Sequence, residues 1–145
     1  MLQIDFLRGY SIELLIDFAL ALLAGFIIGT ERESRGKPAG VSTHSFVIGG
    51  AMLFTYISAH VDPNSTSRIA AQLVTGVGFL AAGIILKSEA EERITNLTTA
   101  VSIWFSVSID MAIGFDLYIM TIIAISLAAL IPMLSNISWL RNVGR

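Results

Sequence analysis

The sequence predicts an all-α, polytopic membrane protein built as a bundle of five transmembrane helices. Of its 145 residues, 54% are hydrophobic and only 14% are charged, whereas an ordinary soluble domain contains about 25% charged residues. The mean hydropathy is +0.76. Nearly all charged residues lie between long apolar runs, and a helix needs about 20 residues to cross the hydrocarbon of a bilayer.

The apolar runs give the predicted spans one by one. They cover residues 12–28, 45–58, 69–86, 97–113 and 118–134. The second run is short, but extending it over 41–59 adds only small or polar residues and gives a crossing length. These spans use most of the chain, so we expect residues 1–145 to form a single transmembrane domain with short loops.

The basic residues predict how the bundle lies in the membrane. With five spans, seven of the nine Lys and Arg residues fall on one side and two, Arg8 and Arg68, on the other. Basic residues in short loops stay in the cytoplasm. We therefore expect the N-terminus outside and the C-terminus in the cytoplasm. The seven are Arg32, Arg35, Lys37, Lys87, Arg93, Arg141 and Arg145.

Four motifs follow one another between Gly25 and Gly114, and together they resemble the membrane domain of the MgtC/SapB family. The first motif ends the first span, and the second motif, Thr43-His44, begins the second span. The other three motifs read Gly25-Phe-Ile-Ile-Gly29-Thr-Glu31-Arg32-Glu33, Gln72-Leu-Val-Thr-Gly76-Val-Gly78-Phe79-Leu80-Ala-Ala-Gly83, and Asn96-Leu97-Thr98-Thr99-Ala100 with Trp104 following.

The resemblance implies a small multi-pass protein of the bacterial cytoplasmic (inner) membrane. Members of this family are associated with adaptation to low magnesium and with virulence, and one is reported to bind and restrain the ATP synthase. The resemblance thus favours regulation over transport. Many members also carry a C-terminal ACT-like domain, which we expect this chain to lack.

Two departures from the family pattern affect the predicted cytoplasmic surface. Ser42 stands where the family usually has an arginine, and Thr95-Asn96 stands where it usually has Arg-Gly. Both changes remove a basic residue. An anionic ligand or partner of the family would therefore be held less well here.

Small residues at helical spacing predict close helix packing. In lipid, such residues let helix backbones approach each other. Three lie on one face of the first span, Ala21, Gly25 and Gly29; the third span has Gly76 and Gly83 on one stripe and Ala71, Thr75, Gly78 and Ala82 on another. Two such stripes predict a central position for the third span. The faces would pack either within one chain or between two, and we expect a homodimer.

Two aspartates, Asp17 and Asp110, lie inside predicted spans, and both fall toward the predicted external side. Arg68 and Gln72 begin the third span on the same side. A carboxylate within a bilayer costs at least about 2.5 kcal/mol, so each needs a partner or water. Either the aspartates pair with Arg68 or snorkel to the interface, or the four residues form a polar vestibule that attracts a cation or relays a proton.

A second polar group gathers where the first span ends and the second and fourth begin. Its candidates are Glu31, Arg32, His44, Asn96, Thr98 and Thr99. Two interpretations remain open. The charged residues of this group either form a solvated helix end with local ion pairs, with Asn96 or Thr95 capping the fourth span, or the group binds a ligand or docks a partner.

The sequence contains no motif of a catalytic, nucleotide-binding or zinc site, so we expect no enzyme, no catalytic residue and no bound cofactor. A net charge of −2 does not favour nucleic acid as a partner. Magnesium in a loop, at Asp62, Glu89, Glu91 or Glu92, is left open.

Three functions remain in view. The first is a regulator that binds another membrane protein, the second is a magnesium or proton transporter or channel formed by a homodimer, and the third is a structural assembly module. Sparse polarity inside the spans favours the first.

Overall fold

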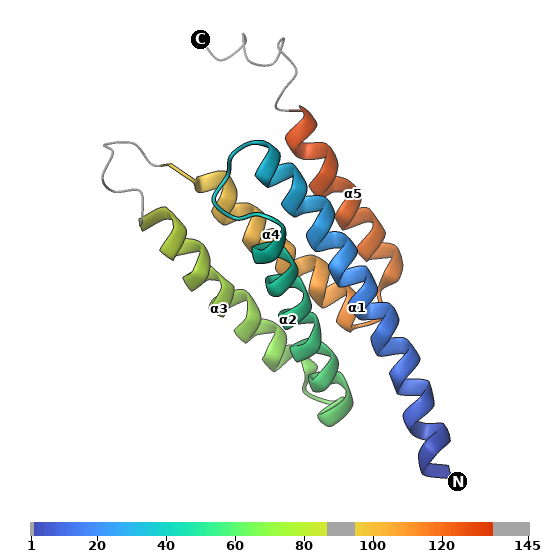
Figure 1. The fold of residues 1–145 in the computed structure, drawn as a ribbon. Coiled ribbons are helices and arrows are strands. Elements are labelled where there is room, and N and C mark those ends of the chain that lie inside the picture. The colour runs from blue at the N-terminus through green and yellow to red at the C-terminus, as the bar shows by residue number, and fades with distance from the viewer. Residues whose placement is uncertain (1, 87–94, 135–145) are drawn as a thin grey trace.

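In a computed structural model of the chain, the backbone is described for residues 2–86 and 95–134 and the side chains for residues 12–85 and 95–134 (Figure 1). All regular structure in these ranges is helical. The helices are α1 (Leu2–Ser34), α2 (Val41–Val61), α3 (Thr66–Leu86), α4 (Leu97–Gly114) and α5 (Tyr118–Leu134). The all-α prediction is confirmed, and α2 adopts the extended range rather than the short apolar run.

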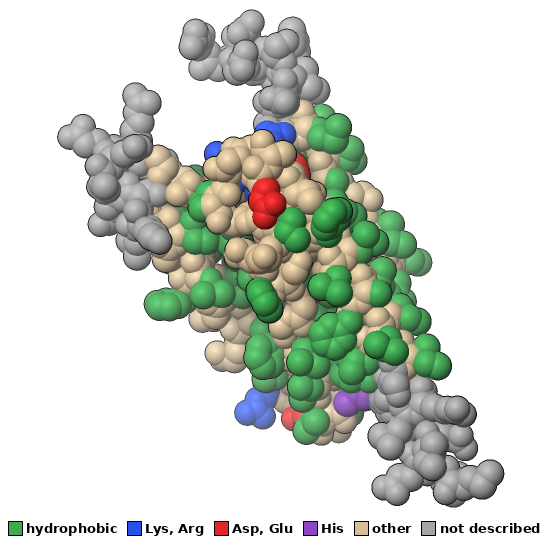
Figure 2. All heavy atoms as spheres, in the orientation of Figure 1, with side chains coloured by type: hydrophobic (Ala, Val, Ile, Leu, Met, Phe, Trp, Pro, Cys, Tyr) green, Lys and Arg blue, Asp and Glu red, His purple; other side chains and the backbone are tan. Residues whose placement is uncertain are grey.

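The composition of these helices fits a membrane. Three segments are long and apolar enough to cross a bilayer, Ile12–Ser34 of α1, Thr66–Ile85 of α3 and all of α4, while α5 is apolar but shorter. Figure 2 shows hydrophobic side chains over the middle of the visible face and coloured charged groups near its two ends. Such an exposed apolar band between polar ends is typical of a surface that faces lipid.

The number of crossings and their direction stay predictions. Five of the basic residues that predict the orientation lie outside the part of the chain whose side chains are described. Three acidic residues that were left open as magnesium ligands also lie outside it. These residues are Arg8, Lys87, Arg93, Arg141 and Arg145, and Glu89, Glu91 and Glu92.

Helix α4 is the centre of the bundle. It packs against each of the other four helices, whereas, within residues 2–86 and 95–134, α3 packs only against α2 and α4, and α5 only against α4 and α1. In Figure 1, α3 and α5 accordingly lie on opposite sides of the bundle. The predicted central position of the third span is therefore wrong. Its small residues were interpreted as two buried faces, but only one narrow face of α3, with Val77 and Ala81, is buried.

The glycines of α1 bring α1 and α2 together. A Cβ atom on Gly25 would lie 2.6 Å from the Cα atom of Ser45, and one on Gly29 would overlap the backbone of Val41. Ala21 is fully buried on the same face of α1. Packing within one chain thus accounts for this small-residue face. In contrast, Cβ atoms added at Gly76, Gly78 and Gly83 of α3 would meet nothing within 4 Å.

The connection between α1 and α2 is a tight, self-capped turn. The amide of Lys37 donates to the Arg32 carbonyl at 3.0 Å and the amide of Gly36 donates to the Glu33 carbonyl at 2.9 Å. Gly36 has a φ of 63°, as expected where a helix ends in a Schellman motif. The Glu33 carboxylate then accepts the Val41 amide at 2.9 Å. One acidic side chain therefore caps the start of the next helix.

Replacing Gly29 by alanine should destabilise the bundle, because the added methyl group would overlap the Val41 backbone. We expect the free energy of unfolding in detergent to fall by about 1–3 kcal/mol. The matched control is Gly78→Ala on α3, where the methyl group has free space and alanine favours a helix by about 1 kcal/mol. Equal stability of the two variants would refute the close contact.

Replacing Glu33 by alanine should loosen the first turn of α2, because the Val41 amide loses its acceptor. A lost helix cap costs about 1 kcal/mol, which a thermal melt in detergent can resolve. Glu33→Gln keeps a side-chain oxygen and should recover most of this loss. If glutamine is as destabilising as alanine, charge rather than capping explains the effect.

Candidate functional site

Nine polar or charged side chains are buried in the described part of the bundle, and three of them belong to α4. This is a large polar content for a helix bundle whose outer surface is apolar, because a buried polar group costs free energy unless it is hydrogen-bonded. They are Asp17, Arg32, His44, Thr55, Ser58, Thr99, Ser106, Asp110 and Thr121. They fall into a group at the end where α1 meets α2, here called the loop end, and a group deeper in the bundle.

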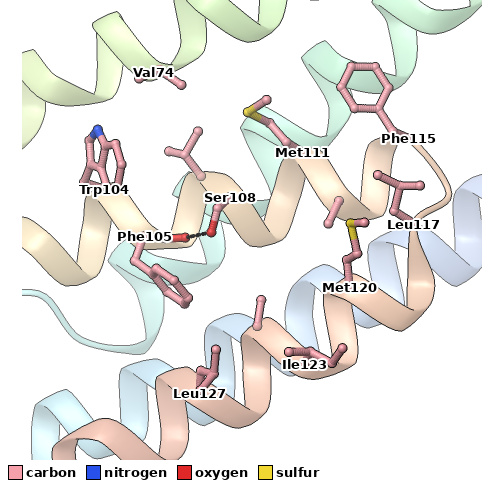
Figure 3. A pocket seen from close by; sticks show the side chains of 13 residues that line it. Val74, Trp104, Phe105, Ser108, Met111, Phe115, Leu117, Met120, Ile123 and Leu127 are labelled. Carbon is pink, nitrogen blue, oxygen red and sulfur yellow. Dashed lines mark hydrogen bonds between the residues drawn. The ribbon is translucent and has the colours of Figure 1, made fainter.

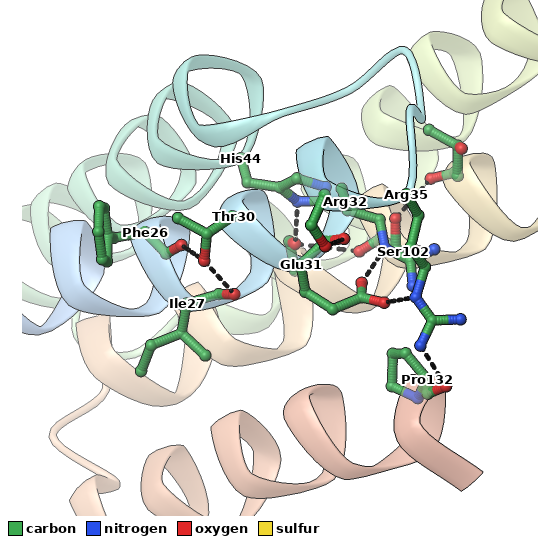
Figure 4. Close-up of polar contacts among 12 residues, drawn as sticks. Phe26, Ile27, Thr30, Glu31, Arg32, Arg35, His44, Ser102 and Pro132 are labelled. Carbon is green, nitrogen blue, oxygen red and sulfur yellow. Dashed lines mark hydrogen bonds and ion pairs between the residues drawn. The ribbon is translucent and has the colours of Figure 1, made fainter. Parts of the chain in front are cut away.

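At the loop end, Glu31 lies between two arginines (Figure 4). Its carboxylate forms ion pairs with Arg32 and with Arg35. Arg32 is only 6% exposed. Ion pairs are stronger away from water than at an open surface. The pairs of Glu31 therefore contribute more to the packing of this end than pairs on a solvated helix end would.

Arg35 extends this arrangement to the last helix. Its Nη2 atom donates to the carbonyl oxygen of Pro132 at 2.5 Å. That carbonyl belongs to the last turn of α5, where carbonyl groups lack helical partners. A basic side chain at this position caps the helix and matches its dipole. The end of α1 is thereby tied to the end of α5.

Beside this ion pair, a chain of hydrogen bonds runs from α2 into α4. His44 Nδ1 lies 3.0 Å from Ser106 Oγ. The Ser106 hydroxyl donates to the Ser102 carbonyl at 3.0 Å, and the Ser102 hydroxyl donates to the Thr99 carbonyl at 2.8 Å. The ring of His44 on α2 is thus bonded to a hydroxyl of α4, and both serine hydroxyls donate to backbone carbonyls of α4.

The predicted loop-end group is brought together only in part. Glu31, Arg32 and His44 lie close together, and Thr99 is buried in the first turn of α4, whereas Thr98 is exposed. Asn96 is half-buried at the start of α4 with a φ of 61°, and its side chain makes no capping hydrogen bond. Of the two capping residues left open, Asn96 stands at the N-cap position, without a side-chain cap. It begins the helix through a left-handed backbone that asparagine tolerates.

Ser102 and Ser106 belong to this network but were not predicted. A signal for them exists in the sequence. Thr99, Ser102, Ser106 and Asp110 recur at intervals of three, four and four residues, which places them on one face of an otherwise apolar helix. Inspecting small hydroxyl side chains by helical position would have shown a polar face along α4.

The four residues of the predicted external vestibule are not brought together. Arg68 and Gln72 are exposed on α3, while Asp17 and Asp110 are fully buried. Among the described residues neither aspartate forms an ion pair with Arg68, so this one of the alternatives left open by the sequence is not found. The reason is the peripheral position of α3, which turns Arg68 away from the core.

Asp17 and Asp110 have different surroundings. The Tyr118 hydroxyl lies 3.2 Å from Asp17 Oδ1 and 3.0 Å from Asp116 Oδ1. Asp116 has a φ of 58° in the turn that joins α4 to α5. Asp17 is thus held to that turn, whereas no side chain in the described part of the chain hydrogen-bonds to the carboxylate of Asp110.

An apolar groove of about 530 Å³ runs along the outer side of α4, between α3 and α5. Figure 3 shows Trp104 and Met111 of α4 opposite Val74 of α3, and Met120 and Ile123 of α5 on the other side. The groove is separate from the loop-end network. Its apolar lining suits a lipid chain or a helix rather than a polar substrate.

Within residues 12–85 and 95–134, no three His, Asp or Glu side chains form a group suited to a metal ion. The chemistry that the described arrangement supports is therefore ion pairing at the loop end, hydrogen bonding through hydroxyls, and the exchange of a proton at a buried aspartate or histidine.

Comparison with known proteins identifies the family. Residues 18–140 match the MgtC family. The putative magnesium transporter YhiD of Escherichia coli (strain K12) is 42% identical over 118 residues, which cover 73% of this chain and 53% of that protein. Protein MgtC of Salmonella typhimurium (strain 14028s / SGSC 2262) is 39% identical over 100 residues, which cover 69% and 42%.

Protein SrpB of Synechococcus elongatus (strain ATCC 33912 / PCC 7942 / FACHB-805) is 34% identical, over 92% of this chain and 81% of that protein. The chain spans about half the length of YhiD and MgtC. No solved structure matches it. The family match over residues 18–140 covers the whole bundle from Phe18 onward, and the chain therefore belongs to the MgtC family.

Proposed function

We propose that this chain is a small regulatory protein of the bacterial cytoplasmic membrane, linked to magnesium and stress adaptation, that acts by binding another membrane protein. The observation that carries the proposal is the open face of α3. This face is the stripe of Ala71, Thr75, Gly78 and Ala82: Ala71, Thr75 and Ala82 are exposed, and a Cβ atom added at Gly78 would meet nothing within 4 Å. Small residues on an uncovered membrane helix are the usual contact for a second helix.

The apolar groove adjoins this open face. Val74 lines the groove, and Ala71 and Gly78 stand three residues before it and four after it, so all three lie along one side of α3. A partner helix placed in the groove would meet both the small residues of α3 and the side chains of α4 and α5. An existing slot of this shape lowers the cost of docking because little has to rearrange.

The loop end supplies the second contact in this proposal. Glu31 pairs with Arg32 and Arg35, and Arg35 is bonded to the end of α5. Leu97 and Thr98 at the start of α4 are exposed at the same end. We place this end in the cytoplasm, with the N-terminus outside and five crossings. The protein acts as a homodimer and not as an enzyme, and magnesium is a signal rather than a resident cofactor.

A second candidate function is transport of magnesium or protons by the homodimer. Two observations favour it: the relative YhiD is described as a putative magnesium transporter, and Asp110 is fully buried with no side chain of the described residues hydrogen-bonded to it. Carboxylates inside membrane bundles commonly mark ion or proton paths. A third candidate, a structural assembly module, needs only the open face of α3.

Gly78→Leu should abolish partner binding and leave the folded chain intact, because the leucine fills the open face but no atom of the chain lies near it. The measurement is in-membrane cross-linking followed by identification of the cross-linked proteins. Gly49→Leu is the matched control, since Gly49 also has open space on α2. Equal cross-linking of wild type and both variants would reject α3 as the docking face, and loss of the homodimer alone would favour the assembly module.

Flux measurements separate regulation from transport. We expect the purified protein in liposomes to carry no magnesium or proton flux above empty vesicles. If flux is present and falls to the level of empty vesicles in Asp110→Asn or Asp17→Asn, transport replaces regulation as the function. Circular dichroism of the same vesicles shows that each variant is folded.

A further inference from the structure

A row of buried polar atoms without hydrogen-bond partners lies where α2 packs against α4. Within the described part of the chain these atoms are Thr99 Oγ1, His44 Nε2, both carboxylate oxygens of Asp110, and Thr55 Oγ1. All four residues are at most 1% exposed. Buried polar atoms are almost always satisfied, so several in one interface indicate a function rather than chance.

The packing register places Asp110 in this interface. Ser106, one turn before it, is 3.0 Å from His44 of α2. Gly114, one turn after it, packs so closely on α2 that a Cβ there would lie 2.7 Å from Thr55 Cβ. Residues four apart share a helix face, so Asp110 faces α2 between His44 and Thr55, beside the buried Ile48.

The hydrogen bonds assign a role to His44. Because the Ser106 hydroxyl donates its proton to the Ser102 carbonyl, the Ser106 oxygen accepts the Nδ1–H of His44. Nε2 then carries a lone pair and no proton. A proton acceptor without a partner therefore lies about one helical turn from a carboxyl group without a partner.

No neighbouring charge compensates an ionised Asp110. The titratable and charged groups on the helices around α4 are otherwise engaged or turned away. Asp17 of α1 is bound by Tyr118 of α5, Glu31 and Arg32 of α1 are paired with each other, His60 at the end of α2 bonds the Tyr56 carbonyl, and Arg68 of α3 is exposed.

We propose that Asp110 is a proton-binding site inside the bundle, and that its proton exchanges with the loop end through His44, whose ring is held in place by the Ser106 hydroxyl. The carboxyl group holds the proton and His44 Nε2 is the base that takes it up. Toward the loop end a polar side chain occurs at each turn of α4. Toward the opposite end, Ile113 and Gly114 follow Asp110 instead.

A proton fits this position better than a metal ion. Magnesium requires about six oxygen ligands in an octahedron, whereas the face of α2 opposite Asp110 presents the apolar side chains of Ile48 and Met52. A proton needs only the carboxyl group and one acceptor. The inference concerns this interface alone and does not depend on the proposed partner.

The test is infrared spectroscopy of protein carrying isotope-labelled aspartate, reconstituted in phosphatidylcholine vesicles at neutral pH. We expect absorption from a protonated aspartate carboxyl group that disappears in Asp110→Asn and persists in Asp62→Asn, an exposed control. Asp110→Glu should remove the band from labelled aspartate and restore it with labelled glutamate, which shows that the site and not the fold is responsible.

Two results would overturn the proton site. One is a labelled wild-type spectrum without a protonated carboxyl band, which would make Asp110 ionised. The other is a band that magnesium abolishes at constant pH, which would make the site a cation site.

The route has its own measurement, the rate at which the band shifts after transfer to heavy water. Ser106→Ala should slow the shift at least severalfold, whereas Thr55→Val on the far side should leave it unchanged. Slowing by Thr55→Val alone would place the route at the opposite end and refute exchange through the loop end.

Discussion

The contact of α1 with α2 at Gly25 and Gly29 is the constraint on which the rest of the bundle depends. Because no side chain separates the two backbones there, the helices cannot slide along each other. This fixed register lets Glu33 reach the Val41 amide and places His44 level with Ser106 of α4. In a lipid solvent, where apolar surface gains little from association, close backbone packing of this kind supplies much of the specificity.

The fold could largely be predicted from the sequence, and the reason is physical. Bilayer thickness sets the length of an apolar helix, so the apolar runs marked where the helices lie. The apolar run of α2 is short, but α2 covers nearly the extended range that was predicted from the length needed to cross a bilayer. The position of α3 could not be predicted. Small residues favour close packing in the same way against a helix of the same chain and against another chain, so Gly76 and Gly78 alone did not distinguish the two.

The candidate site was predictable where it is built from charged motifs. Glu31, Arg32, His44 and Thr99 converge because three helix ends meet at one depth. The sequence could not decide whether Asp110 pairs with Arg68, since opposite charge says nothing about which way each helix faces. Ser106 was missed because a lone serine in a span is unremarkable until its helical neighbours Ser102 and Asp110 are considered together.

The peripheral position of α3 has a consequence for the energetics of the whole molecule. A helix that packs on only two others is the segment expected to separate first in native-state fluctuations, since local opening costs least where the fewest contacts are lost. Anything that covers its outer face then raises the free energy of that opening by mass action. The stability measured in a membrane would therefore depend on protein density. Binding of a partner to the outer face of α3 would stabilise α4, and through α4 the other helices that pack on it.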